Sequence, residues 1–221
     1  MYAIKTEKLT KFYGKHRGIV DIDLLVEEGD FFGFIGPNGA GKSTTIRTLL
    51  GLIGATSGKA EIFGKDTVGC KTDILKDVGY LPSDAAFYSG MRVRDIIELS
   101  ASLRGLDCTA EAELLCKRLE LDVTRKVDEL SLGNKKKVGI VCALQHRPKL
   151  YILDEPTSGL DPLMQREFYS ILEERNKQGA TVFLFDSGMA ELFDTVGDEN
   201  ASLSYNGRML TVSCHLGKYM R

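Results

Sequence analysis

Short apolar runs separated by polar and glycine-rich segments characterise the first third of the chain, a pattern typical of strands joined by loops. Polar and apolar residues alternate in the first two runs, which favours a small antiparallel sheet. The third run is continuously apolar and ends in glycines, as expected of a buried strand. Apolar residues then recur at helical spacing. The elements predicted here are strands at 3–7, 19–26, 29–36 and 78–81 and a helix at 42–50.

The spacing of apolar residues becomes helical from about residue 90 to residue 147. A first helix is marked by Val93, Ile96, Ile97 and Leu103, and two more are predicted at 111–119 and 138–144. Strands return at 150–153 and 181–185, on either side of a helix near 162–177. This order predicts an α/β fold with a mainly parallel sheet, interrupted by a helical insertion. We predict one domain over 1–221, with its core at 1–82 and 148–221 and the insertion at 83–147.

Composition excludes several classes of function. The chain carries 29 Lys and Arg against 31 Asp and Glu, and this net charge of −2 argues against an electrostatic nucleic-acid binder. We find no apolar run near the ~20 residues that cross a bilayer and no signal peptide, so a cytosolic protein is expected. Five scattered cysteines without a C-x-x-C pair, and three isolated histidines, disfavour a disulfide framework or a zinc site.

A glycine-rich loop between the third strand and the first helix matches G-x-x-x-x-G-K-[ST]. Glycines let main-chain N–H groups surround phosphate oxygens, and the helix N-terminus adds partial positive charge. Lys42 is expected to reach the β- and γ-phosphates, and the Ser43 hydroxyl is expected to bind Mg²⁺. The strand-to-helix setting disfavours the alternative of an accidental turn. The predicted phosphate-binding residues are Gly36, Pro37, Asn38, Gly39, Ala40, Gly41, Lys42, Ser43 and Thr44.

Two carboxylates, Asp154 and Glu155, follow the apolar strand 150–153. Sheets of α/β proteins bind ligands at this end of their strands. Asp154 is expected to hold Mg²⁺, and Glu155 to polarise the attacking water as general base. A solvated strand end is the alternative for the pair taken alone. A GTPase is disfavoured, because Lys137 occupies the place of the carboxylate in the guanine motif N-K-x-D.

Taken in order, these motifs resemble those of the ATP-binding cassette (ABC) family along essentially the whole chain. The segment 130–134 is similar to the LSGGQ signature, and 156–161 to the D-loop. The segment 9–14 is similar to the one whose aromatic residue, here Tyr13, stacks on adenine. The resemblance implies a P-loop NTPase (RecA-like) core, a small antiparallel N-terminal β-subdomain and an inserted helical subdomain.

The resemblance also implies a mechanism. Two cassettes would enclose two ATP molecules with Mg²⁺, as a homodimer or a heterodimer. Ser131 and Gly133 of one subunit would contact the γ-phosphate bound by the other, and Asp161 would help to join the two sites. Closure and reopening would drive separate membrane permease subunits, which would place the chain in the cytoplasm, on the inner face of the cell membrane.

Two groups of residues leave alternatives open. Lys135, Lys136 and Lys137 either add positive potential near the γ-phosphate or form a solvated basic face of a helix. The segment with Phe87, Tyr88 and Met91 either lines the groove that receives a permease helix or packs within the insertion.

Several positions depart from the family pattern. Ser83 stands where the Q-loop usually has Gln, with Asp84 adjacent as a substitute, and Leu132 and Asn134 replace Gly and Gln of the signature. Ser187 stands at the switch His, and a serine cannot carry the charge of an imidazolium. Slow turnover is therefore expected.

The segment after the switch position is atypical as well. Residues 194–200 lack the usual Asp-Arg pair, 201–205 is a poor strand, and 206–207 predicts a hairpin turn.

The leading interpretation is an ATP-binding and ATP-hydrolysing subunit of a membrane ABC transporter, most similar to single-cassette export systems. The alternative is a regulatory ATP-binding subunit that hydrolyses little and pairs with an intact cassette. A soluble ABC protein that acts on ribosomes or DNA is disfavoured, because those usually carry two cassettes or long coiled-coil insertions.

Overall fold

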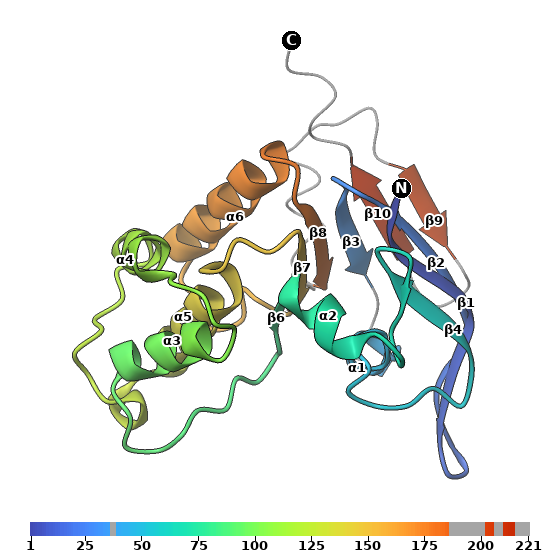
Figure 1. Cartoon of the computed structure of the whole chain (residues 1–221), viewed down its shortest axis with the longest axis horizontal. Coiled ribbons are helices and arrows are strands. Elements are labelled where there is room, and N and C mark those ends of the chain that lie inside the picture. Colours follow the sequence, from blue (N-terminus) through green and yellow to red (C-terminus); the bar gives the residue numbers. More distant parts are fainter. Residues whose placement is uncertain (36–38, 186–201, 206–209, 215–221) are drawn as a thin grey trace.

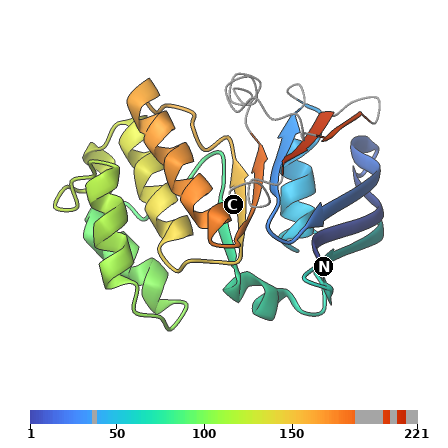
Figure 2. The same cartoon turned by 90° about the horizontal axis from the view of Figure 1, so that it is seen from above.

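Two β-sheets form the frame of the fold, with helix α1 between them and the longer helices on the far side of the larger sheet (Figures 1 and 2). This computed structural model describes residues 1–35, 39–185, 202–205 and 210–214, and it describes side chains in 1–33 and 39–185. Within those residues, no helix combines the length and the apolar character that a membrane span requires.

The smaller sheet is antiparallel, with strand order β2-β1-β4-β5. Its strands are β1 (Tyr2–Tyr13), β2 (His16–Glu27), β4 (Ser57–Ile62) and β5 (Lys65–Asp66). The larger sheet has the order β6-β7-β8-β3-β10-β9, parallel from β6 to β3 and antiparallel at β10 and β9. Its strands are β3 (Phe31–Ile35), β6 (Val78–Leu81), β7 (Leu150–Asp154), β8 (Thr181–Phe185), β9 (Ser202–Tyr205) and β10 (Leu210–Cys214).

The parallel strands are mostly apolar because both faces of the sheet are covered. Along β8, Val182 and Leu184 belong to the buried cluster on the helical side, whereas Phe183 and Phe185 belong to the cluster around α1. Leu153 and Ile152 divide between the two clusters in the same way. The alternation of successive side chains across a strand therefore builds two cores from one short apolar run.

The helices are α1 (Lys42–Leu49), α2 (Lys71–Lys76), α3 (Val93–Ser102), α4 (Thr109–Arg118), α5 (Leu132–Leu144) and α6 (Pro162–Lys177), with a 3₁₀ turn at Val127–Glu129. Helices α3 to α5 lie within the predicted insertion, and they share one buried cluster with α6 and one face of the larger sheet. This arrangement confirms the predicted α/β fold with a mainly parallel sheet, a small antiparallel sheet and a group of helices between β6 and β7.

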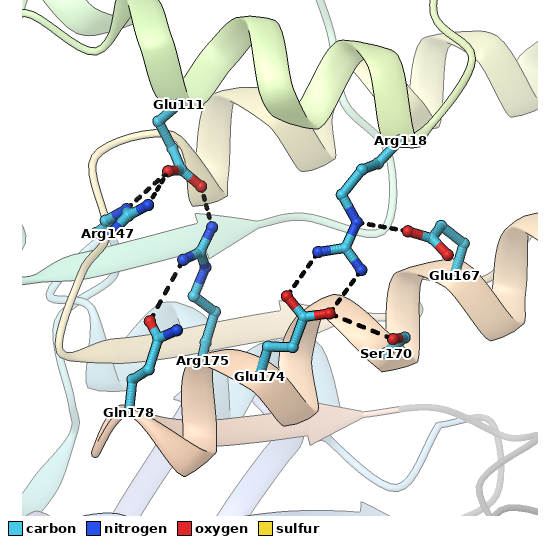
Figure 3. Close-up of polar contacts among 8 residues, drawn as sticks. All are labelled: Glu111, Arg118, Arg147, Glu167, Ser170, Glu174, Arg175 and Gln178. Atoms are coloured by element: carbon cyan, nitrogen blue, oxygen red, sulfur yellow. Dashed lines mark hydrogen bonds and ion pairs between the residues drawn. The ribbon is translucent and has the colours of Figure 1, made fainter.

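Two clusters of charged residues join α4 of the insertion to α6 of the core (Figure 3). Glu111 on α4 pairs with Arg175 on α6 and with Arg147 after α5. Arg118, at the C-terminal end of α4, bonds Glu167 and Glu174 of α6 with N–O distances of 2.5 and 2.7 Å. The insertion is therefore fixed to the core by ion pairs as well as by apolar packing.

The observed elements differ from the predicted ones in several places. Strands β4 and β5 and helix α2 were not predicted, and α5 begins six residues before 138. The Leu103 side chain is 80% exposed, so it does not belong to the apolar face of α3 as the spacing predicted. Residues 202–205 form strand β9 despite their weak pattern, whereas 194–200 and 206–207 lie outside the described residues.

Candidate nucleotide-binding site

The glycine-rich loop between β3 and α1 requires glycine for steric reasons. Gly41 caps α1 with a φ of 95°, and a Cβ there would lie 2.5 Å from Cγ2 of Ile19 on β2. No other residue type fits that contact and that backbone conformation. The predicted residues Gly36, Pro37 and Asn38 lie outside the described part of the loop.

A cavity of about 290 Å³ opens at the N-terminus of α1. It brings together residues predicted from three separate motifs of the sequence: Tyr13, Gly39, Gly41, Lys42, Ser43, Thr44 and Glu155. Ala40 packs beside the apolar cluster around α1. The N–H groups and partial positive charge of the first turn of α1, together with the Lys42 ammonium, give this cavity the chemistry of a phosphate site.

Tyr13 lies at the end of β1 with 46% of its surface exposed. The Nζ atom of Lys11 lies 5.5 Å from the centroid of its ring. An adenine base stacks on the flat apolar face of an aromatic ring, and the exposure of Tyr13 leaves surface for such stacking.

The sequence interpretation missed two residues that line the same cavity, Arg17 and Gly18 on β2. A Cβ on Gly18 would lie 3.1 Å from the Tyr13 ring and 3.3 Å from the Thr44 methyl group, so glycine lets the hairpin approach the loop. Arg17 adds a second cationic side chain to the lining of the cavity, which also contains Lys42. Only the glycine offered a signal in the sequence, since it interrupts a strand.

Asp154 and Glu155 differ in their surroundings. Asp154 ends β7 and is 2% exposed. The pKa of the nearby Tyr80 is raised mainly because Tyr80 is partly buried, and secondly by the negative charge of Asp154. Glu155 is half-buried, lines the cavity, and adopts a φ of 47°. Ser43 lines the cavity, whereas Asp154 is not among the described residues that line it. By their chemistry, the Ser43 hydroxyl and the Asp154 carboxylate are hard oxygen donors of the kind that Mg²⁺ prefers.

The signature and D-loop residues lie elsewhere. Ser131 is exposed and caps α5, its hydroxyl accepting from the N–H of Asn134 over 3.3 Å. Asp161 caps α6, accepting from the N–H of Met164 over 3.0 Å. Among the described residues that line the cavity, none comes from either segment, Gly133 included.

The signature and D-loop segments contact each other within the chain. A Cβ on Gly133 would lie 2.3 Å from the carbonyl oxygen of Gly159, too close for any side chain. Leu132, next to it, is 68% exposed. The packing of Gly133 against Gly159 within this chain thus requires glycine at position 133, independently of any contact with a second chain.

The lysines after the signature contradict one of the two sequence interpretations. Lys136 and Lys137 are 3% and 8% exposed and Lys135 is half-buried, so these residues do not form a solvated basic face. The Lys136 ammonium donates to the carbonyl oxygens of Ser83 over 2.5 Å and of Glu155 over 3.1 Å. Helix α5 is therefore buried on most sides, and the Lys136 ammonium joins it to the main chain at Ser83 and Glu155.

The remaining predicted positions fall in three places. Phe87 and Met91 pack partly buried against the core cluster. Phe87 and Tyr88 also line a groove of about 680 Å³ between α2 and α3, where Tyr88 is 74% exposed. Asp84 is exposed on the segment after β6, and Ser187 lies outside the described residues.

Comparison with known proteins identifies relatives over most of the chain. A family profile described as "ABC transporter" matches residues 19–158. The bacitracin transport ATP-binding protein BcrA of Bacillus licheniformis is 38% identical over 213 residues, covering 94% of this chain and 68% of that protein. The probable multidrug ABC transporter ATP-binding protein YbhF of Escherichia coli is 33% identical, covering 94% of this chain and 36% of that protein.

A solved structure described as "Structure of ATP binding subunit of ABC transporter" superposes with a TM-score of 0.80 at 30% identity, covering 87% of this chain and 82% of that one. The chain thus spans about two thirds of BcrA and about one third of YbhF.

Proposed function

This chain belongs to the ABC transporter family as an ATP-binding subunit, and from that premise we propose that it hydrolyses ATP to power export through separate permease chains. The observation that carries the proposal is the cavity at the start of α1. There the loop residues Lys42 and Ser43 face the same space as the carboxylate-bearing Glu155.

The proposed reaction uses groups of this chain in three roles. Lys42, Thr44 and the N–H groups at the start of α1 bind the phosphates, and Tyr13 stacks on the adenine. Mg²⁺, held by Ser43 and Asp154, would neutralise charge on the phosphate oxygens. Glu155 accepts a proton from water as that water attacks the γ-phosphorus and the bond to ADP breaks. The products are ADP and inorganic phosphate.

We propose that a second cassette completes each site, as a homodimer or a heterodimer. Ser131 and Gly133 belong to a segment that does not line the chain's own cavity, which fits their proposed contact with the nucleotide of a partner. Leu132 and Leu163 are 68% and 64% exposed near the signature and D-loop. Apolar side chains of this exposure favour a surface that is covered in the assembly. Asp161 would join the two sites there.

The permease would dock in the groove between α2 and α3. Tyr88 and Leu103 are among its most exposed lining residues, at 74% and 80%, and Leu52 is 48% exposed. An apolar helix seated there would contact the core and the insertion together. This docking would hold the chain in the cytoplasm on the inner face of the membrane, and the net charge of −2 offers no electrostatic basis for binding nucleic acid.

Hydrolysis by the purified chain tests the proposal. Turnover that is lost in Glu155→Gln, with ATP binding retained, is the expected result. The regulatory alternative is favoured by one observation, the serine at position 187, and it predicts ATP binding without turnover that depends on Glu155. Ser187→His should raise turnover if the missing imidazole limits it.

A further inference from the structure

The turn that carries the proposed general base is held from several sides. Glu155 adopts a left-handed backbone conformation that residues other than glycine seldom adopt. Its N–H donates to the carbonyl oxygen of Phe185, at the end of β8, over 2.7 Å. Its own carbonyl oxygen accepts from Lys136 on α5 over 3.1 Å. A residue in such a conformation persists only where its surroundings fix it.

Lys136 joins this turn to another part of the chain. Its ammonium, which is almost completely buried, also donates to the carbonyl oxygen of Ser83 over 2.5 Å. A buried ammonium requires polar partners in place of water, so these contacts are strong. Ser83 lies 53 residues before Lys136, on the segment that leads from β6 into the insertion. One side chain therefore connects α5, the entry of the insertion and the turn after β7.

Helix α5 contacts the same turn at a second point. The main chain of Gly133 approaches Gly159 so closely that no side chain fits between them. Leu132 packs at the same place, 3.4 Å from the position that a Cβ on Gly159 would occupy. The first two turns of α5 and the segment 155–159 therefore form one packed unit.

Resting on the proposed function, we propose that Lys136 is a positioning residue for ATP hydrolysis. By holding the carbonyl group of Glu155, it sets the direction of the Glu155 carboxylate toward the cavity. Ser131 caps the helix that carries Lys136, so a displacement of the signature is transmitted to the general base. The contact at residue 83 uses a main-chain oxygen and does not depend on the side chain that replaces the usual Gln.

The test substitutes Lys136→Met, which keeps the length of the side chain and removes the donor. The dissociation constant for ATP, measured by calorimetry, should stay within about twofold, because the side chain does not line the cavity. The kcat should fall by about tenfold or more, since a misplaced catalytic group costs up to about 100-fold per ångström. Lys136→Arg restores a cation and should recover part of the kcat.

Hydrogen exchange gives a second measurement that does not need turnover. The N–H groups of Glu155 and Ser158 are hydrogen-bonded in this turn. They should exchange about tenfold faster in Lys136→Met, while the N–H groups of α6 keep their rates. Lys137→Met is the matched control, because it removes the neighbouring buried ammonium on the same helix, and it should preserve both kcat and exchange.

The outcomes separate this inference from the proposed function. A Lys136→Met variant that keeps its kcat within twofold, or that loses protection equally throughout the chain, overturns the positioning role. If Lys136→Met does not fold, Lys136→Gln replaces it and must meet the same criteria. If the unmodified chain shows no turnover dependent on Glu155, the proposed function fails. The exchange of the 155–158 segment then decides the inference by itself.

Discussion

The ion pair between Glu111 and Arg175 predicts a large loss of stability when one partner is neutralised. Both side chains are below 10% exposed, so neither charge has water as an alternative partner. Glu111→Gln keeps the size of the side chain but leaves the Arg175 guanidinium buried without the carboxylate that it bonds. Breaking a buried pair in this way costs about 3–5 kcal/mol. Arg147 adds little to this figure, because it is 59% exposed.

The neighbouring cluster supplies a matched control. Glu174 bonds Arg118 across the same two helices, but it is 48% exposed, and Arg118 keeps Glu167 as a second partner. Glu174→Gln should therefore cost only about 1 kcal/mol or less. The paired substitution Glu111→Leu with Arg175→Met removes both charges and should be more stable than either single variant, because no charge is left buried alone.

Urea denaturation at pH 7 measures these free energies of unfolding. The slope against urea should stay unchanged, so that differences in midpoint report stability. Equal losses in Glu111→Gln and Glu174→Gln would refute the reasoning. Strict additivity of the losses at Glu111 and Arg175 would refute it as well, because residues that interact directly do not add.

Three further predictions concern binding, pH and an orphaned hydroxyl. Lys42→Ala should abolish ATP binding in calorimetry, and an unchanged affinity would contradict the assignment of the phosphate loop. Burial, with the charge of Arg104, lowers the pKa of His146 from 6.5 to about 4, so the unfolded chain binds more protons between these values. The free energy of unfolding should therefore fall by about 2 kcal/mol as the pH drops from 6.5 to 4, after allowing for partial exposure. In His146→Gln, whose amide keeps a donor for the carbonyl oxygen of Val78, the loss over this pH range should be smaller by about 2 kcal/mol. Unfolding free energies from urea denaturation that change equally with pH in both proteins would contradict the idea. The Tyr151 hydroxyl is buried without a hydrogen-bond partner among the described residues. Tyr151→Phe should therefore raise the free energy of unfolding by about 1 kcal/mol. A decrease of more than about 1 kcal/mol in urea denaturation would show that the hydroxyl is bonded.

The buried strands and the longest helix could be predicted because their signals are local. The apolar run 181–185 coincides with β8, and Pro162 follows an Asp that caps α6, which is a common way to begin a helix. Strand β4 gave no such signal, because only Ala60 and Ile62 of its six residues are buried. Helix α2 buries Ile74 alone. Elements with so few buried positions cannot be read from periodicity.

The candidate site could be predicted only where a motif carries it. The phosphate loop and the Asp154–Glu155 pair follow from residue types with a fixed spacing. The role of Lys136 depends on carbonyl oxygens 19 and 53 residues away, so its sequence context shows only a run of like charges. The contribution of Arg17 to the cavity likewise depends on where the hairpin of β1 and β2 lies relative to the start of α1.

The position of β3 in the larger sheet has a consequence for synthesis on the ribosome. This strand, which leads into the phosphate loop, pairs with β8 and β10, whose residues follow it by roughly 150 and 180 positions. A nascent chain therefore holds the loop long before it holds the strands that flank it. Until translation reaches β8 and β10, β3 has neither of its neighbouring strands to pair with, and unpaired strand edges with exposed apolar surface favour aggregation.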